Sequence, residues 1–251
     1  MKKIYGINPI KILLRQKEAG LTRIYVSSGR GGSAAREIID LARQKKIPVE
    51  IRQRQNLDEL AGNKNHQGVV GLSESYSYRD LNVLIKNRNK FSKYDLILIL
   101  DSVMDPQNLG SIIRSACCLG SNGVIIPTDR AAPVTAAVIK ASAGSALQIP
   151  VARVANLSQV IDSLKEKGFW VFGTATRGGK DLRQADFNCS VALLLGGEAK
   201  GIRPLLQKKC DFLLSISMAG NFDSLNVAVA AGIIQHEIFR QRNQALTAEV
   251  K

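Results

Sequence analysis

The spacing of hydrophobic residues divides the chain into two parts with different patterns. In the first part, short apolar stretches alternate with segments of helical periodicity, which predicts a small α/β domain. Asn8-Pro9 predicts a helix start, because Asn caps helices and Pro suits the first helical position. Strands are expected at 24–26, at 48–51 and after His66-Gln67-Gly68. Further helices are expected around Ile38 and from Asn56, as a helix cap, to a stop near Gly62.

The second part opens with an unbroken apolar run at 96–100. Continuous apolar strands separated by helical patterns are typical of a parallel sheet that helices cover on both faces. Further strands are expected at 124–126, 170–172, 191–195 and 212–214. We therefore predict an α/β fold with a small domain over 1–75, a polar and basic linker over 76–94, a parallel-sheet domain over 95–244 and a tail over 245–251.

The charge is unevenly spread along the chain. Residues 1–94 hold 19 Lys and Arg against 8 Asp and Glu, a net charge of +11, whereas residues 95–251 hold 16 against 13, a net charge of +3. A basic segment joined to a more neutral domain favours binding to a nucleic acid. A solubilising surface is the alternative explanation. A membrane surface is less favoured, because the basic residues are not gathered on one amphipathic helix.

The remaining composition points to the cytoplasm. The chain has no apolar run of about 18 residues, and its first residues lack the pattern of a secretory signal. Its four cysteines show no metal-site spacing and are interpreted as reduced core residues. His66 and His236 lie too far apart to suggest a zinc site, so no metal is expected.

Three strand ends carry unusual polar sequences, at 101–114, 195–204 and 215–227. Ligands of open α/β sheets bind beyond the carboxyl ends of the strands, which makes these segments candidates for a site. Each also has a plain structural explanation: the glycines as tight turns, Ser224 as a helix cap and Arg114 as a solvated side chain.

Two common nucleotide-binding motifs are absent from the sequence. The segment 196–201 is not a Walker loop, because no Gly-Lys-Ser/Thr follows at the required spacing. No Gly-x-Gly-x-x-Gly follows the first strand of a βαβ unit either. A cofactor held by its phosphates is therefore disfavoured.

The three segments together resemble the signature motifs of the SpoU (TrmH) family of SPOUT methyltransferases. Asp-Pro-x-Asn-Leu-Gly-x-Ile-x-Arg is intact over 105–114, Gly-Glu-x-x-Gly over 197–201 and Ser-Leu-Asn-Val over 224–227. His66-Gln67-Gly68-Val69 resembles the end of the family's N-terminal substrate-binding domain, which is similar to a ribosomal protein. The resemblance implies a trefoil knot in the sheet domain, and the layout is most similar to the large-subunit ribosomal RNA guanosine methyltransferases.

The resemblance also assigns residues. S-adenosyl-L-methionine is the implied cofactor, and its adenosine would meet backbone groups and apolar walls, as suits a neutral base. The implied cofactor-binding residues are Thr174, Gly196, Ile216, Met218 and Leu225. The implied catalytic residues are Arg114, Asn108, Glu198, Ser224 and Asn226. The alternative for Glu198 is a purely structural role in a turn.

The implied reaction is methylation of a ribose 2′-hydroxyl. Arg114 is viewed in the family as the base, yet a guanidinium rarely deprotonates, so a fixed cation beside the developing alkoxide is an equally sound role. The expected partners are ribosomal RNA, held by the basic N-terminal domain, and a second copy of the chain. Transfer RNA, a drug-resistance role and a non-catalytic ribosome-assembly module are the alternatives. One set of apolar residues would form either the dimer face or part of the chain's own core. These residues are Val227, Val229, Ile233, Ile234 and Ile238.

Overall fold

The computed structural model of the 251-residue chain divides into two compact units. It describes residues 2–15, 20–28, 32–73, 76–86, 92–176, 178–197, 200–219 and 224–248. Unit 1 comprises Met1–Ser77 together with Val134–Gln148, and unit 2 comprises Tyr78–Pro133 together with Ile149–Lys251. The segment Val134–Gln148 thus groups with the N-terminal residues although it lies in the second half of the chain. The pattern of hydrophobic residues did not anticipate this grouping.

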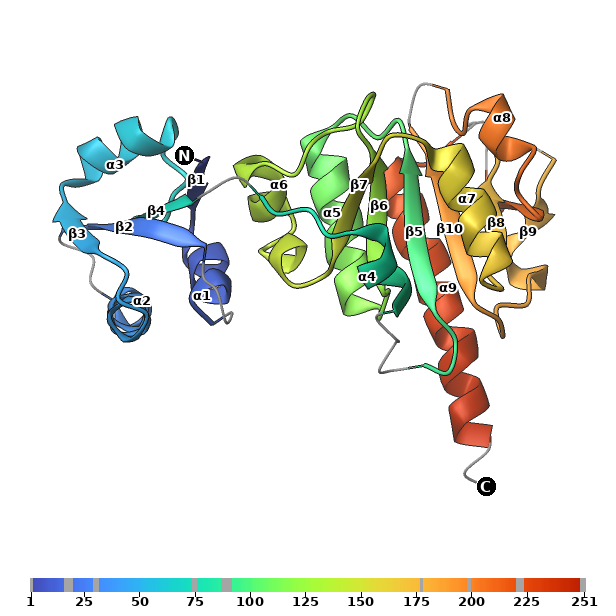
Figure 1. The fold of residues 1–251 in the computed structure, drawn as a ribbon, viewed down its shortest axis with the longest axis horizontal. Coiled ribbons are helices and arrows are strands. Elements are labelled where there is room, and N and C mark those ends of the chain that lie inside the picture. Colours follow the sequence, from blue (N-terminus) through green and yellow to red (C-terminus); the bar gives the residue numbers. More distant parts are fainter. Residues whose placement is uncertain are drawn as a thin grey trace. The chain divides into compact units, whose positions relative to one another are not determined.

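Unit 1 is a four-stranded sheet in the order β1-β4-β2-β3 with helices on both faces. β4 pairs antiparallel with β1 and β2, and β2 pairs parallel with β3. Figure 1 shows α3 on one face and α1 with α2 on the other. The elements are β1 (Lys2–Tyr5), α1 (Ile7–Arg15), β2 (Leu21–Ser27), α2 (Ser33–Gln44), β3 (Val49–Arg52), α3 (Arg54–Ala61), β4 (Val69–Ser73), α6 (Ala136–Ala141) and the 3₁₀ turn η1 (Ser145–Leu147).

Alternation along the strands of unit 1 explains its two cores. Ile24 is fully buried, whereas its neighbour Tyr25 packs with Leu57 of α3 and Val70 in a separate cluster. Adjacent residues of a strand point to opposite faces, so β2 serves both layers. α1 approaches the sheet closely, because a Cβ on Gly71 would lie 2.6 Å from Cδ1 of Ile10.

Two predicted helix caps in unit 1 are wrong. α1 begins at Ile7, so Asn8 lies inside the helix, and Gln67 Oε1 accepts the Ile7 N–H at 3.0 Å. α3 begins at Arg54 with Gln53 at the N-cap position, which places Asn56 in the first turn. Gly62 does end α3, in a left-handed conformation with a φ of 70°.

Unit 2 is a seven-stranded sheet in the order β7-β6-β5-β10-β8-β11-β9, and its strand pairs are parallel. The predicted parallel α/β sheet is therefore confirmed. The short strands β7 and β9 were not predicted. The elements are α4 (Leu81–Lys86), β5 (Leu96–Asp101), α5 (Pro106–Cys118), β6 (Gly123–Pro127), β7 (Val151–Val154), α7 (Leu157–Glu166), β8 (Trp170–Thr174), β9 (Lys180–Asp181), η2 (Leu182–Gln184), β10 (Val191–Gly196), α8 (Pro204–Gln207), β11 (Phe212–Ser215) and α9 (Val227–Ala248).

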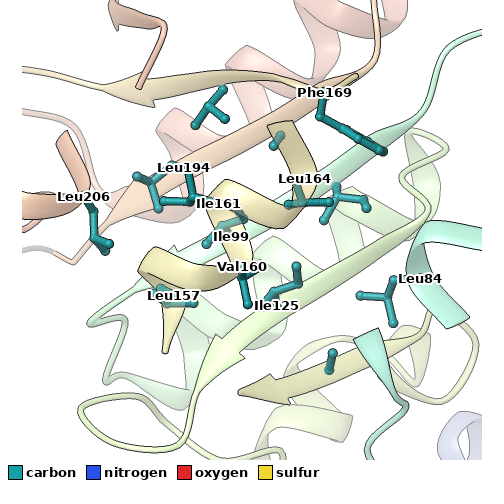
Figure 2. Packing of buried hydrophobic residues seen from close by; sticks show 14 of the residues in the cluster. Leu84, Ile99, Ile125, Leu157, Val160, Ile161, Leu164, Phe169, Leu194 and Leu206 are labelled. Atoms are coloured by element: carbon teal, nitrogen blue, oxygen red, sulfur yellow. The ribbon is translucent and has the colours of Figure 1, made fainter. Parts of the chain in front are cut away.

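Helices cover both faces of this sheet. α4 and α7 lie on one face, and α5 and α9, which contact each other, lie on the other (Figure 1). Figure 2 shows Val160, Ile161 and Leu164 of α7 packed against strand residues such as Ile99 and Leu194. β5 and β10 are buried along their whole length, which explains their unbroken apolar sequences.

Parts of the predicted linker and tail have regular structure. α4 lies within 76–94, and Leu84 is fully buried against the sheet. Residues 87–91 of the predicted linker lie outside the described residues, as do 249–251 of the predicted tail. α9 continues to Ala248. None of the helices in the described parts of the chain is long and apolar enough to cross a membrane.

A buried arginine ties the long helix α9 to the sheet. Arg242 is 6% exposed, and its guanidinium donates hydrogen bonds to the backbone carbonyls of Tyr94, Asp95, Phe187 and Cys189 at 2.8–3.3 Å. Burial lowers the pKa of Arg242 to about 10, so the side chain remains charged at neutral pH. The carbonyls lie beside the starts of β5 and β10, the edge of the sheet opposite the candidate site.

Candidate functional site

A cavity of about 650 Å³ opens at the carboxyl ends of β8, β10 and β11, beside the start of α9. This volume lies within the range of about 300–1,000 Å³ typical of small-molecule sites. All five residues expected to bind a cofactor line the cavity, and Ser224 and Asn226 line it too. The structure therefore brings together two of the three polar segments that the sequence analysis selected.

The third segment joins them through a pair of asparagines. Asn226 Nδ2 donates a hydrogen bond to Asn108 Oδ1 at 2.9 Å. Asn108 lies in the first turn of α5, where Asp105 caps the helix by accepting from the backbone N–H groups of Gln107 and Asn108. The bond therefore links residues 118 positions apart at the starts of two helices.

Asn226 also caps α9. Its Oδ1 accepts the backbone N–H groups of Ala228 at 2.9 Å and Val229 at 3.3 Å. The alternative explanation that made Ser224 the cap is therefore wrong, because Asn226 occupies that role. One side chain thus uses its oxygen to hold a helix and its nitrogen to hold Asn108. The two helix N-termini that it connects both favour negative charge nearby.

Asp101 begins the first of the three polar segments, but the sequence analysis gave it no role of its own. It is fully buried at the end of β5, and it accepts hydrogen bonds from the backbone N–H of Arg203 at 2.9 Å and from its Nε at 2.8 Å. Its backbone carbonyl accepts the Gly197 N–H at 2.8 Å. An acid directly after five buried apolar residues was the signal that could have identified it. Asp101 positions both ends of the loop between β10 and α8.

Two glycines allow the backbone segments to cross at this loop. A Cβ on Gly196 would lie 2.1 Å from the carbonyl carbon of Gly201, and one on Gly197 would lie 2.1 Å from the carbonyl oxygen of Ser102. Such distances exclude any side chain at either position unless the backbone moves. Gly196 is thus a cavity-lining residue whose identity is set by backbone packing. This crossing lies where the resemblance predicts a knot, and the knot stays a prediction.

A polar network anchors the segment Ile216–Met218, whose outer two residues line the cavity. Ser217, between Ile216 and Met218, donates its hydroxyl to Asp181 Oδ2 at 2.5 Å. Arg183 donates its Nε and backbone N–H to Asp181 Oδ1, both at 2.9 Å. These bonds, led by the one from the Arg183 side chain, hold the pKa of Asp181 well below its usual range. The Ile216–Met218 loop is therefore anchored to β9.

Arg114 is not among the described residues that line the cavity. Arg114 lies on an exposed side of α5, and it forms no hydrogen bond or ion pair with the residues that the structure describes. It lies six residues after Asn108, about 9 Å along the helix axis at about 1.5 Å per residue. Glu198 lies outside the described residues, so its expected role stays a prediction.

The lining of the cavity suits a neutral heterocycle. Lys200 is the one charged side chain among the described lining residues, and Leu195, Ile202 and Leu214 add apolar wall. Apolar walls with a few polar groups are the typical surroundings of adenine-like rings. No cluster of His, Cys, Asp and Glu suitable for a metal occurs among the described residues. The parallel sheet and this cavity define an α/β enzyme with a site for a nucleoside-like cofactor.

Comparison with known proteins then identifies the family. A model of the SpoU rRNA Methylase family matches residues 95–236, and a model described as RNA 2′-O ribose methyltransferase substrate binding matches residues 3–79. The chain therefore belongs to the SpoU family, and the resemblance seen in its motifs is confirmed. It is an S-adenosylmethionine-dependent RNA methyltransferase with a SPOUT-type sheet domain.

Relatives and solved structures agree over both units. The putative TrmH family tRNA/rRNA methyltransferase YacO of Bacillus subtilis is 40% identical over 223 residues, which cover 89% of each chain. The SpoU methyltransferase AviRb from Streptomyces viridochromogenes, crystallised with AdoMet, is 30% identical with a TM-score of 0.81, covering 96% of this chain and 89% of that one. An AdoMet-bound rRNA methyltransferase from Sinorhizobium meliloti is 26% identical with a TM-score of 0.77, covering 95% and 87%.

Proposed function

We propose that this protein methylates the 2′-hydroxyl of a guanosine ribose in large-subunit ribosomal RNA. The observation that carries the proposal is the cavity at the carboxyl edge of unit 2, next to the Asn108–Asn226 hydrogen bond at the starts of α5 and α9. Unit 1 supports an RNA substrate, because it matches a substrate-binding model and is strongly basic. The similar rRNA methyltransferase from Sinorhizobium meliloti also spans both units.

The cavity fits S-adenosylmethionine through chemistry that the described residues show. Ile216, Met218 and Leu225 provide flat apolar surface for the adenine, and Thr174 and the backbone of Gly196 provide polar groups. When bound, this cofactor supplies a methyl group on a positively charged sulfur. The anchored Ile216–Met218 loop and the Asp101 contacts keep the wall residues in place, which favours alignment of the reacting atoms.

The chain's own residues then orient the ribose and stabilise its oxygen. In the transfer, the 2′-oxygen bonds to the methyl carbon as the carbon–sulfur bond breaks, and the hydroxyl proton is released. Asn108 and Asn226 orient the ribose, with Ser224 beside them and Glu198 in support. Alignment of this kind supplies up to about 7–11 kcal/mol of the barrier reduction. The proton leaves to solvent or to a base.

Arg114 acts as a fixed cation for the RNA phosphate and the developing alkoxide. Its exposure and its lack of described partners leave its guanidinium accessible to RNA. A guanidinium is a permanent cation with a fork of donors, which favours an electrostatic role over that of a base.

Radiolabelled methyl transfer to unmethylated large-subunit ribosomal RNA tests the proposal. We expect label in a single 2′-O-methylguanosine, located by mapping the modified RNA. Arg114→Ala should abolish transfer while cofactor affinity stays within a few-fold, and Lys167→Ala, at the opposite edge of the sheet, is the matched control. Recovery of methyl transfer by Arg114→Lys at high pH would favour the role of a base over that of a fixed cation. A large loss of cofactor affinity in Arg114→Ala would show that its assigned role is wrong.

Transfer RNA is the second candidate substrate, because the Bacillus subtilis relative is described as a tRNA/rRNA methyltransferase. The same labelling experiment with total RNA separates the two substrates. A protein that binds RNA and labels none would be a non-catalytic module. Action on ribosomal RNA during ribosome assembly would agree with the expected location in the cytoplasm.

We further propose that the protein is a homodimer through α9. Val227, Ile234 and Ile238 are buried in the chain's own core, whereas Val229 is 50% and Ile233 is 39% exposed. The exposed pair are four residues apart and share one side of the helix. Ile233 also borders a hollow of about 510 Å³ beside the Asp181 network. An exposed apolar stripe next to a hollow is the surface that a second copy can cover.

A further inference from the structure

Unit 1 contains a second polar cavity, of about 470 Å³, that the proposed reaction does not use. Three cationic residues line it: Arg54 at the start of α3, Lys64 in the loop after that helix, and Lys140 of α6. Ser27 and Gln67 add a hydroxyl and an amide. Asp and Glu do not occur among the described lining residues. The cavity is therefore a concentration of hydrogen-bond donors and positive charge.

The floor of the cavity is a turn in a preorganised backbone conformation. Gln67 and Gly68 have φ angles of 54° and 79°, which are left-handed values. Buried His66 fixes this turn, because its Nδ1 accepts the Gly68 N–H at 3.0 Å and its Nε2 lies 2.6 Å from Asp58 Oδ1. The carboxylate nearest the turn is thus engaged by His66. Gln67 Oε1 accepts the Ile7 N–H, which leaves its amide nitrogen to donate.

Lys140 completes the cavity from the segment Val134–Gln148. Its Nζ donates to the backbone carbonyl of Asn65 at 3.2 Å and lies 5.2 Å from the centre of the Tyr5 ring. Both contacts hold the ammonium group at the rim. A lysine from the part of the chain between β6 and β7 therefore joins the cations of the N-terminal residues in one site.

We infer that this cavity binds a phosphodiester of the RNA backbone. The inference rests on the proposed function, and it assigns a site on unit 1 where the substrate is held. Three cations with added neutral donors match a phosphate group, which accepts several hydrogen bonds at once. The residues of unit 1, counted over the full sequence, include 15 Lys and Arg against 7 Asp and Glu, a net charge of +8, which favours a polyanion over an isolated anion. No aromatic residue occurs among the described lining residues, so the cavity offers no ring on which a base could stack, which favours a phosphate as its ligand.

Salt dependence of RNA binding tests the site with the full-length protein. Unmethylated large-subunit ribosomal RNA is titrated at several salt concentrations for the wild type and for Arg54→Gln, Lys64→Gln and Lys140→Gln. Loss of this one phosphate contact should reduce the slope of log affinity against log salt by up to about 0.7–0.9, and each single variant removes part of the contact. We expect this reduction in all three variants, together with a several-fold higher KM for RNA and an unchanged kcat.

The matched control is Arg36→Gln, which removes an exposed positive charge from α2 on the opposite face of the unit 1 sheet. Equal slopes for this control and the three cavity variants would overturn the inference, because the effect would then be one of overall charge. Inorganic phosphate is titrated separately. The wild type could bind phosphate saturably while the cavity variants lose this binding and keep unchanged RNA slopes. That result would assign a free anion to the site and would also overturn the inference. Failure of the wild type to methylate any RNA would instead refute the proposed function.

Discussion

Replacing Asn226 separates two interactions that its side chain makes at once. Its oxygen caps α9 through the N–H groups of Ala228 and Val229, and its nitrogen donates to Asn108. Asn226→Ala removes both interactions, whereas Asn226→Ser keeps a capping oxygen and removes the amide nitrogen that donates to Asn108. Loss of a cap costs about 1 kcal/mol, and loss of a hydrogen bond about 0.5–1.5 kcal/mol. We therefore expect a loss of about 2 kcal/mol for Asn226→Ala and about 1 kcal/mol for Asn226→Ser.

Urea denaturation of each variant measures these losses. Asn108→Ala, combined with Asn226→Ser in a double-mutant cycle, isolates the bond between the two side chains. We expect a coupling energy of about 0.5–1.5 kcal/mol in stability. We also expect Asn226→Ser to lower kcat for methyl transfer, since the ribose would lose an oriented partner although the helix remains capped.

Two results would refute this reasoning. Equal destabilisation by Asn226→Ser and Asn226→Ala would show that the oxygen does not cap α9. A coupling energy of zero would show that the Asn108–Asn226 bond contributes nothing in solution, and the link between the two helix starts would then have no energetic basis.

The remaining predictions concern α9. Arg242→Met should lower the free energy of unfolding by about 2–4 kcal/mol, because several buried carbonyls lose their donor. Arg240→Met, which removes an exposed arginine paired with Glu237, should change the free energy of unfolding by about 0.5 kcal/mol or less. Equal losses in the two variants would contradict the buried structural role of Arg242. Val229→Glu should shift the protein from dimer to monomer in analytical ultracentrifugation, and an unchanged mass would remove the support for an α9 interface.

The sheet of unit 2 was predictable because its central strands have a distinctive sequence. β5 and β10 are buried on both faces, so nearly every residue is apolar and the pattern is visible without alignment. β7 contains exposed Arg153, and β9 has two residues, both polar, so neither forms an apolar run. β1 begins with two lysines and was missed for the same reason.

The candidate site was predictable where motifs carried it and not where tertiary contacts created it. Ile216 and Leu225 were selected by resemblance, and the structure places both in one cavity. Asp101 was passed over because its partner Arg203 lies 102 residues away, and no local pattern reveals that contact. The sequence also could not predict that Lys140 lies beside Asn65, because this contact depends on the grouping of Val134–Gln148 with unit 1.

The two units meet different physical demands. Methyl transfer from a sulfonium needs alignment more than strong acid–base chemistry. In unit 2, Gly196 admits no side chain, and Asp101 and Asp181 hold described backbone segments beside the cavity by hydrogen bonds. RNA capture needs charge, which concentrates on unit 1. If the proposed roles hold, this division has a kinetic consequence: loss of a cation from the unit 1 cavity should raise KM for RNA, whereas loss of alignment at Asn226 should lower kcat.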